Sequence, residues 1–419
     1  MKIIVLSGNF KVDFIMKKIF ISFTILGAFL FGCTAKNPRS IEITALEIDA
    51  VQEGDILVGP SVLNDPDYFV WGGSVVKGYD GKFHMLYATW EQGDSVPVFT
   101  NSWVLHSKIA YAISDYPDRD FQSKGIVLTG RNLRGDSTAW DAQMVHNPHI
   151  KKFNGKYYLY FIGSKDPGIQ AKGSKGENLN LRDRVQQNQK IGVIEFESFE
   201  DLLSGNFTRP TEPILQPRTR VKPDNIVNPS PEGTKATPDN IITVNPSVEY
   251  RPSDQKYLLF YKGNFYDPNW RGVHGVAIGD SPTGPFVTTD NFVFDVINEA
   301  GKIASGEDPF VWFHPNHKKF YVILKDFTGR ITGGDPGLAI LESKDGIDWQ
   351  VPANPFFMKK EIILKSGEHV KANRLERPQL LIDESGNPQV LYSAAALINV
   401  NDRRDGSSFN VHIPLQLKQ

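Results

Sequence analysis

Short apolar runs bounded by tight polar turns follow one another along this chain, and one unit of the pattern recurs five times. Each unit is a short strand, a turn rich in Asp, Asn, Gly and Lys, and an aromatic-rich second strand, which is typical of a β-hairpin. A third apolar run follows each hairpin. Five units at a long, regular period predict an all-β, five-bladed β-propeller with four antiparallel strands per blade. The repeated units begin at Gly73, Asn147, Asn245, Asp308 and Arg377.

Other segments complete or interrupt this repeat. A fourth, outer strand is expected in each blade, for example at residues 126–128 and 362–364. Residues 165–190 and 209–240 are polar, lack strand periodicity and fall between blades. Long loops of this kind are usually functional or disordered, so the two segments either cover one face of the propeller or are mobile surface excursions. No segment has the apolar spacing of a long amphipathic helix.

The N-terminal region predicts export. From Met16 the sequence has a pair of lysines, an apolar run over residues 19–31 and a small residue before Cys33, which is the layout of a secretory signal peptide. Residues 30–33 (Leu-Phe-Gly-Cys) resemble the lipobox of bacterial lipoproteins. That resemblance implies a diacylated Cys33 and an exported protein whose lipid anchor holds it at a bacterial membrane, in the periplasm or on the surface. The alternative is an ordinary signal peptide with an incidental cysteine.

These signals divide the chain into an upstream segment with the signal peptide (residues 1–33), a tether and N-terminal segment (34–58) and the propeller (59–419). Cys33 is the only cysteine, so the exported chain has no disulfide and depends on its packed core. The formal net charge is −2, so the chain does not have the excess of basic residues that is typical of a nucleic-acid-binding protein. Aromatic residues make up 11% of the chain, which fits sugar-stacking surfaces and aromatic-rich blades equally well.

Acidic residues stand at the starts of the predicted inner strands, which line the central axis of a propeller. Glu307 and Asp308 are adjacent at the fourth blade, and because a strand alternates its side chains, only one of them is expected to face the axis. Their alternative role is an ion pair with Lys302 or Arg377. Glu376 precedes Arg377, whose planar guanidinium can bind a carboxylate, a sulfate or a sugar hydroxyl, or hold a neighbouring carboxylate ionised.

Another candidate carboxylate, Asp141, precedes the second blade. It follows Trp140 and lies five residues before His146, and the spacing Asp-x5-Asn-Pro is shared with Asp239. Asp is also a common turn residue, so Asp141 belongs either to a site or to a turn, and for Asp239 the turn is favoured. Glycoside hydrolysis needs one carboxylic acid to protonate the leaving oxygen and a second carboxylate to activate water or attack carbon. Strand starts from different blades can supply such an opposed pair.

The repeated hairpins and the turn over residues 280–286 (Asp-Ser-Pro-Thr-Gly-Pro-Phe) resemble the five-bladed β-propeller glycosidases of families 43 and 117, over about residues 60–415. Residues 245–286 look most like the family 117 anhydro-galactosidases, in which a His after Ser-Gly serves as the acid. Here Glu307 follows Ser-Gly, so the resemblance implies that Glu307 is the general acid. Two positions depart from the families. Residues 72–74 (Gly-Gly-Ser) carry no carboxylate where the families have their general-base Asp, and Asn245 replaces an acidic residue in the third blade.

Together, the residues and the resemblance predict an exo-acting glycoside hydrolase for oligosaccharides from plant or algal polysaccharides. Glu307 is the predicted acid and Asp141 the predicted base. Asp308 or Glu376 is predicted to tune the pKa values of this catalytic pair, and both are the next candidates for the base. The predicted substrate subsite is formed by His146, Arg131, Arg377, Trp71 and Trp140.

His146 and Asn147 could ligate a metal ion or order water beneath the pocket, but no ligand spacing supports such a site strongly. No cofactor is predicted, and a structural Ca²⁺ is left open. The expected partner is an oligosaccharide or polysaccharide. One alternative is a non-catalytic carbohydrate-binding lipoprotein with a glycosidase-like propeller, which the missing carboxylate of blade one favours. A further alternative is a scaffold that docks protein partners on its face. The fold by itself does not decide among these functions.

Overall fold

The structure of the protein is a computed structural model that describes residues 40–266, 270–295 and 306–418. Antiparallel sheets follow one another along this part of the chain, and the blades each begin with their innermost strand. From the axis outward, the first blade comprises β5 (Tyr68–Lys77), β6 (Phe83–Glu91), β7 (Lys108–Ser114) and β8 (Gln122–Leu128). The second comprises β9 (Met144–Phe153), β10 (Lys156–Ser164) and β11 (Lys190–Phe196).

The remaining blades repeat this order. The third comprises β12 (Val244–Arg251), β13 (Lys256–Tyr266), β14 (Trp270–Gly279) and β15 (Phe286–Val293). The fourth comprises β16 (Gly306–His314), β17 (Lys319–Asp326) and β18 (Gly337–Ser343), which pairs with both β19 (Trp349–Gln350) and β20 (Phe356–Lys359). The fifth begins with β23 (Arg374–Ile382), β24 (Pro388–Ala396) and β25 (Phe409–Leu417).

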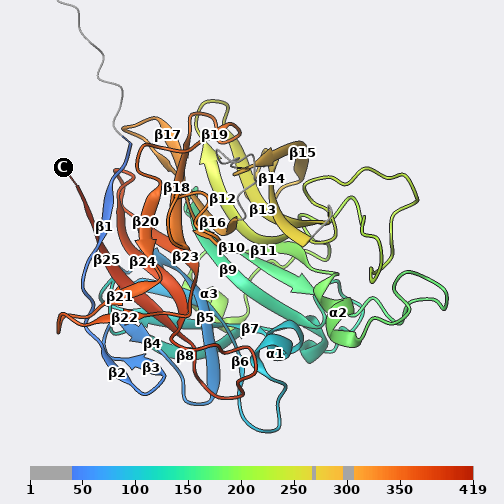
Figure 1. Cartoon of the computed structure of the whole chain (residues 1–419), viewed down its shortest axis with the longest axis horizontal. Helices are drawn as coiled ribbons and strands as arrows, with labels where there is room; N and C mark the ends of the chain where they lie inside the picture. Colours follow the sequence, from blue (N-terminus) through green and yellow to red (C-terminus); the bar gives the residue numbers. More distant parts are fainter. Residues whose placement is uncertain (1–39, 267–269, 296–305, 419) are drawn as a thin grey trace, which may run out of the picture. The chain divides into compact units, whose positions relative to one another are not determined.

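The innermost strands form a closed ring. β5 contacts β9, β9 contacts β12, β12 contacts β16, and β16 contacts β23, which in turn contacts β5. The fifth blade therefore meets the first, and Figure 1 shows the blades following one another in chain order. The predicted five-bladed β-propeller is confirmed. The predicted signal peptide and Cys33 lie outside the described residues.

The turn between β9 and β10 shows why this sequence forms hairpins. Asn154 and Gly155 have φ values of 48° and 86°, the left-handed pair that a two-residue type I′ turn requires. The strand that follows is buried on both faces, because Phe161 packs into the core shared with the first blade and Tyr160 into the core shared with the third. Burial on both faces explains the continuous apolar runs of the middle strands.

Each inner strand breaks its pairing register near its start. In the first blade the register shifts between Val70 and Gly73, and the other blades shift at the equivalent point. A β-bulge of this kind redirects a side chain. In blades two to five, the residue before a proline at this point has a left-handed backbone, with φ values of 49°, 56°, 58° and 54° at Asn147, Asn245, Asp308 and Arg377.

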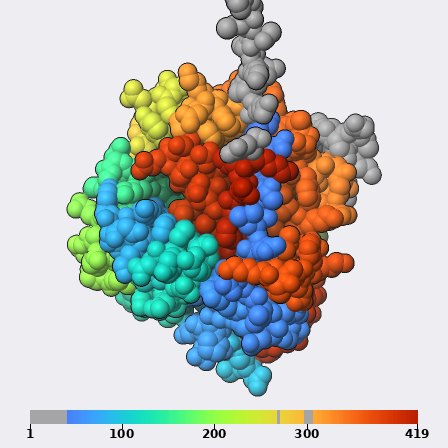
Figure 2. Space-filling view, turned by 90° about the vertical axis from the view of Figure 1, so that its left-hand side faces the viewer, coloured from blue at the N-terminus to red at the C-terminus, as the bar shows by residue number. Residues whose placement is uncertain are grey.

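The N-terminal segment adds to the fifth blade. β1 (Ile43–Ala45) pairs with β25, and β4 (Val62–Leu63) pairs with a neighbouring stretch of the same strand. Figure 2 shows this segment in blue against the C-terminal blade in red. Residues that the sequence placed in the 34–58 segment therefore belong to the propeller sheet, because their backbone pairs with β25. β2 (Val51–Glu53) and β3 (Ile56–Val58) form a separate hairpin.

The two predicted outer strands had different outcomes. Residues 126–128 form the end of β8, as expected. Residues 362–364 were wrongly placed, because β21 (Glu361–Ile363) pairs with β22 (His369–Lys371) in a separate two-stranded sheet. The outer edge of the fourth blade is made by β19 and β20 instead. In the second blade, isolated bridges to Thr208 and Leu215 mark that edge.

Short helices connect the strands. α1 (Phe99–His106) lies between β6 and β7, α2 (Leu181–Gln186) belongs to the polar segment 165–190, and α3 (Phe199–Ser204) follows β11. A 3-10 turn, η1 (Arg131–Arg134), follows β8. None of the helices in the described ranges is long and apolar enough to cross a membrane.

Candidate active site

A cavity of about 240 Å³ lies at the starts of the inner strands, which we call the axial cavity. Every blade contributes to its wall. Trp71, Trp90, Phe99 and Trp103, which we call the aromatic side, come from the first blade and α1. The charged residues come from the third, fourth and fifth blades. Aromatic surfaces beside a few converging polar groups are typical of ligand sites. The aromatic residues are Trp71, Trp90, Phe99, Trp103 and Trp270. The charged residues are Lys262, Glu307, Asp308, Arg374, Glu376 and Arg377, and the amides include Asn147, Asn245 and Asn264.

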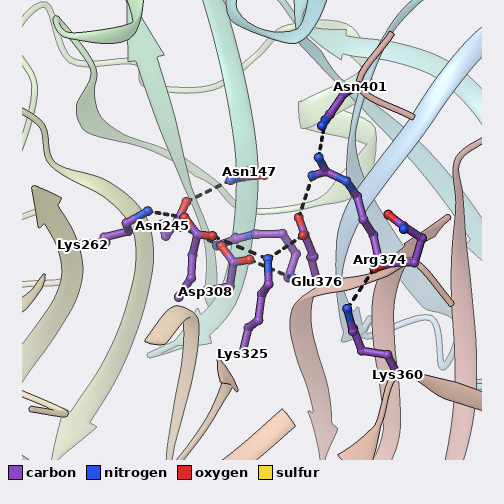
Figure 3. A network of polar contacts seen from close by, with 12 residues as sticks. Asn147, Asn245, Lys262, Asp308, Lys325, Lys360, Arg374, Glu376 and Asn401 are labelled. Atoms are coloured by element: carbon purple, nitrogen blue, oxygen red, sulfur yellow. Dashed lines mark hydrogen bonds and ion pairs between the residues drawn. The ribbon is translucent and has the colours of Figure 1, made fainter. Parts of the chain in front are cut away.

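Hydrogen bonds join the inner strands of four consecutive blades around the axis. Asn147 Nδ2 donates to Asn245 Oδ1 at 2.9 Å, and Asn245 Nδ2 donates to Asp308 Oδ1 at 2.7 Å. The backbone N–H of Arg377 donates to Asp308 Oδ2 at 3.1 Å. Figure 3 shows this network with the lysines and the arginine around it. These four residues share the bulge position, so the bulge is what brings them together.

Glu307 and Asp308 both line the axial cavity. The expectation from strand alternation, that only one of them would face the axis, is therefore wrong. The bulge explains the difference, because the register shifts between Glu307 and Phe310 and Asp308 takes a φ of 58°. Two adjacent carboxyl groups can thus face one cavity.

Two lysines from neighbouring second strands hold Glu307. Lys262 Nζ donates to Glu307 Oε1, and Lys325 Nζ lies 3.9 Å from Oε2. Burial alone would raise the pKa of Glu307, but the two ammonium groups outweigh burial and lower that pKa to about 2. Glu307 is therefore ionised at neutral pH, which does not fit the predicted general acid. Lys302, one predicted partner, lies outside the described residues.

Asp308 has the opposite electrostatic environment. Its side chain is only 5% exposed. Burial and then the negative charge of Glu307 raise the pKa of Asp308 to about 6, against the opposing charge of Arg377. Adjacent carboxyl groups whose pKa values are pushed apart are the arrangement from which acid and base roles arise. The other predicted ion pair, with Arg377, is present, because Arg377 Nη1 lies 3.5 Å from Asp308 Oδ1.

Glu376 is the third carboxylate of the axial cavity. Lys325 Nζ lies 2.5 Å from Glu376 Oε1, and Arg374 Nη1 lies 3.4 Å from Oε2. Burial would lower the pKa of Lys325, but Glu376 and Glu307 raise it, so this lysine stays charged between them. Arg374 also donates to Asn401 and lies over the Phe99 ring at 5.7 Å. The carboxylates are thus held in place by cations from three strands or loops.

Arg377 crowds the first inner strand next to its bulge position, which is occupied by Trp71. A Cβ atom at Gly72 would lie 2.7 Å from Arg377 Cβ and 2.9 Å from Cγ, which is closer than real side chains approach. The Arg377 side chain therefore occupies the space beside the first inner strand, and glycine is required there. Nε and Nη2 of Arg377 are buried and have no hydrogen-bond partner among the residues that the structure describes.

Two other predicted subsite residues, His146 and Trp71, also line the axial cavity. The Nδ1 atom of His146 is 2.7 Å from Ser107 Oγ, and its ring stacks on Trp103 with centroids 4.9 Å apart. Burial lowers the pKa of His146 to about 3, so the imidazole is neutral. Trp71 meets Phe99 edge to face at 5.2 Å, and both belong to the aromatic side.

Asp141 and Arg131 are not among the residues that line the axial cavity. Asp141 is fully buried, and Arg209 Nη2 lies 2.6 Å from its Oδ2. Arg131 Nε lies 3.4 Å from Asp141 Oδ1, and Arg131 also donates to the carbonyl of Pro210. The geometry gives Asp141 a structural role that anchors the inter-blade segment, in place of the predicted general base.

Trp140 is likewise outside the cavity lining. It is 7% exposed and stacks on Phe161 with centroids 5.9 Å apart. Cβ atoms at Gly163 and Gly192 would lie 2.5 Å and 2.6 Å from its ring, so the indole fills the core between β10 and β11. The prediction that Trp140 shapes the subsite does not agree with this placement.

Lys262 and Lys325 were not predicted from the sequence. They occupy the same register position in consecutive blades, because Lys262 pairs with Val244 and Lys325 pairs with Glu307. A residue opposite an inner-strand start lies at the mouth of the axis, so the lysines at this position in the third and fourth blades were the available signal. The contributions of Phe99 and Trp103 depend on α1, which has no counterpart in the repeat.

A metal site was not predicted, and a structural Ca²⁺ was left open. Among the described residues, no group of three or more His, Cys, Asp or Glu side chains is placed to hold a metal ion. The charges that surround the carboxylates of the axial cavity come from lysine and arginine side chains.

Comparison with solved structures concerns the whole described chain. Neither a family model nor a curated protein sequence matches this sequence. Zg3597, a family 117 glycoside hydrolase of Zobellia galactanivorans, is similar with a TM-score of 0.52 and 15% identity, over 91% of each chain. The chain has the propeller fold of this glycoside hydrolase.

Two further solved structures share the arrangement. BT0996, solved as an RGII complex, has a TM-score of 0.55 at 12% identity, over 85% of this chain and 91% of its own. A protein described as a glycoside hydrolase has a TM-score of 0.54 at 12% identity, over 89% and 92%. At these identities the likeness concerns the fold, and a function has to be argued from the axial cavity.

Proposed function

We propose that this protein is a glycoside hydrolase that removes sugars from the ends of oligosaccharides derived from plant or algal polysaccharides. The observation that carries the proposal is the carboxyl pair in the axial cavity, in which the pKa of Asp308 is raised and that of Glu307 is lowered. The fold shared with Zg3597 supports the same reaction class.

The roles follow from the protonation states. Asp308 is the carboxyl whose surroundings favour the neutral acid, so it is the candidate proton donor to the leaving oxygen. Glu307 stays ionised and is the candidate to activate water or to stabilise positive charge at the anomeric carbon. Glu376 is the alternative for the second role, since it also lines the axial cavity.

Exo action fits the shape of the site. The cavity is lined by residues near the starts of the inner strands of all five blades, and the Asn147–Asn245–Asp308 hydrogen bonds link neighbouring blades there. A site enclosed by a ring of strands receives the end of a sugar chain more readily than its middle. The aromatic side, with Trp71 and Trp103, can pack against the apolar face of a sugar ring.

A hydrolysis screen tests the proposal. Purified protein and its Glu307→Gln variant would be incubated with a panel of plant and algal oligosaccharides, and the released sugars would be separated by chromatography. We expect monosaccharide release by the parent and a large loss in the variant. Oligosaccharide retention on an affinity gel without any turnover would instead support a non-catalytic binding protein.

The binding alternative has one specific observation in its favour. The bulge position of the first blade, which is equivalent to Asp308 in the fourth, holds Trp71 and no carboxylate, and Arg377 fills the space beside Gly72. A protein that uses this cavity only for binding would keep its affinity for the retained oligosaccharide in the Glu307→Gln variant.

The pH dependence of turnover is predicted from the same pair. The active form needs Glu307 ionised and Asp308 protonated, so kcat/KM should rise through about pH 2 and fall through about pH 6. The fall in kcat/KM at higher pH is the informative part of the profile, because an Asp with its ordinary pKa of 3.8 would place this fall near pH 3.8. Initial rates across a pH series, with stability checked at each pH, measure this profile. A rate that stays constant well above pH 6 would contradict the assignment of Asp308.

We also propose that the protein is exported and anchored through a lipid on Cys33. The support is the basic, apolar and small-residue order of residues 16–33. In a bacterial host, Cys33→Ser should move the protein from the membrane fraction to the soluble fraction and abolish labelling by a fatty acid. Unchanged membrane association and labelling in the variant would contradict the anchor.

A further inference from the structure

A second cavity of about 460 Å³ adjoins the axial cavity, and we call it the outer cavity. The two share four lining residues, Gln186, Ile242, Asn264 and Trp270. They are therefore two compartments of one cleft. The outer compartment has roughly twice the volume of the inner one, so the cleft has more room than one sugar at the axis needs.

The wall of the outer cavity comes from the two polar segments that interrupt the repeat. Asp183 and Gln187 come from segment 165–190, and Lys222 and Asn225 come from segment 209–240. The segments are tied together, because Gln187 Nε2 donates to the Asn225 carbonyl at 2.9 Å and Gln187 Oε1 accepts from the Val227 N–H at 3.1 Å. The nitrogen and the oxygen of one glutamine side-chain amide are thus both hydrogen-bonded between the two segments, which fixes this wall of the cavity.

Trp270 stands where the two compartments meet. It is 49% exposed, which is unusual for so large an apolar side chain. The ammonium group of Lys222 lies 5.8 Å from its ring centre. An open indole face beside a cation offers the mixed apolar and polar surface that a sugar ring requires.

We propose that the outer cavity binds the leaving-group side of the substrate, with one sugar ring packed on Trp270. The preferred substrate is then an oligosaccharide longer than a disaccharide, whose terminal sugar enters the axial cavity while the following sugars lie along the two polar segments. This inference rests on the proposed glycosidase function for its orientation. The length preference itself can be measured by binding alone.

Affinity as a function of chain length tests the inference. Calorimetry would measure the binding of xylo-, arabino- and agaro-oligosaccharides, from monosaccharide to hexasaccharide, to the parent and to Trp270→Ala. For a series that binds, we expect affinity to increase beyond the disaccharide in the parent. Trp270→Ala should lose about three- to tenfold in affinity for the longer oligomers and a smaller factor for the monosaccharide, because Trp270 stands at the edge of the axial cavity.

Tyr116→Ala is the matched control. Tyr116 is also an exposed aromatic residue, at 46%, with the Arg119 guanidinium 3.9 Å from its ring centre, and it lines neither cavity. This variant should bind every oligomer as the parent does. Affinity that does not increase with length in any series, or that Trp270→Ala leaves unchanged, would overturn the inference. Length-dependent binding without hydrolysis would overturn only the proposed function.

Discussion

Replacing Asp308 with asparagine is expected to lower kcat/KM on a natural oligosaccharide by about 10²–10⁴-fold, the usual contribution of a general acid. Asparagine fits the local backbone, because Asn147 and Asn245 take the same left-handed conformation in the preceding blades. Its single side-chain oxygen can replace only one of the two carboxylate oxygens, which accept from Asn245 Nδ2 and from the Arg377 N–H, so one of these two hydrogen bonds is lost. The substitution therefore removes the proton with little change in shape.

The leaving group separates a catalytic role from a structural one. A dinitrophenyl glycoside departs without protonation, so Asp308→Asn should hydrolyse it at a rate much closer to that of the parent. Asp239→Asn is the control, because Asp239 is also buried and paired with an arginine, Arg218, but does not line the axial cavity. An equal loss on both substrates in Asp308→Asn would show that Asp308 does not donate the proton.

Replacing Asp141 with alanine is expected to destabilise the protein by about 3–5 kcal/mol, the cost of leaving a buried charge without its partner. The side chains of Arg209 and Arg131 are 8% and 13% exposed, so both cations would remain largely buried and face each other. Urea unfolding followed by tryptophan fluorescence measures the change. Turnover per folded molecule should stay within a few-fold of the parent.

A double variant completes this prediction. Asp141→Ala with Arg209→Met removes the buried cation together with its partner, so part of the lost stability should return. The contrary result would be an Asp141→Asn variant that is as stable as the parent and has no turnover. That outcome would restore Asp141 as the general base that the sequence suggested.

The sequence predicted the fold well because the propeller repeats its information in every blade. Turns such as Asn154-Gly155 and the aromatic second strands are local signals, and each hairpin can be recognised without knowledge of its neighbours. The β-bulge at the start of each inner strand was harder to predict from the sequence. Its only local signal is the Asn, Asp or Arg that precedes a proline in blades two to five. Strand alternation was applied to Glu307 and Asp308, and the left-handed φ at Asp308 made that rule fail there.

The charge partners could not be predicted because they are remote in sequence. Asp141 and Asp239 share their spacing to the inner strand, and each pairs with an arginine of segment 209–240, Arg209 and Arg218. The shared spacing therefore marks two anchors of that segment and not a catalytic pair. In the same way, Lys262 reaches Glu307 from another blade, and without that contact a general-acid role for Glu307 was a reasonable prediction.

The protonation state of Asp308 is the most direct test of this account. NMR titration of protein labelled with ¹³C at its carboxyl groups, compared with Asp308→Asn and Glu307→Gln, would assign the two resonances. We expect the Asp308 carboxyl to titrate near pH 6 and the Glu307 carboxyl to remain ionised down to about pH 2. A Glu307 resonance that titrates near neutral pH, with Asp308 ionised throughout, would contradict the account and return the acid role to Glu307.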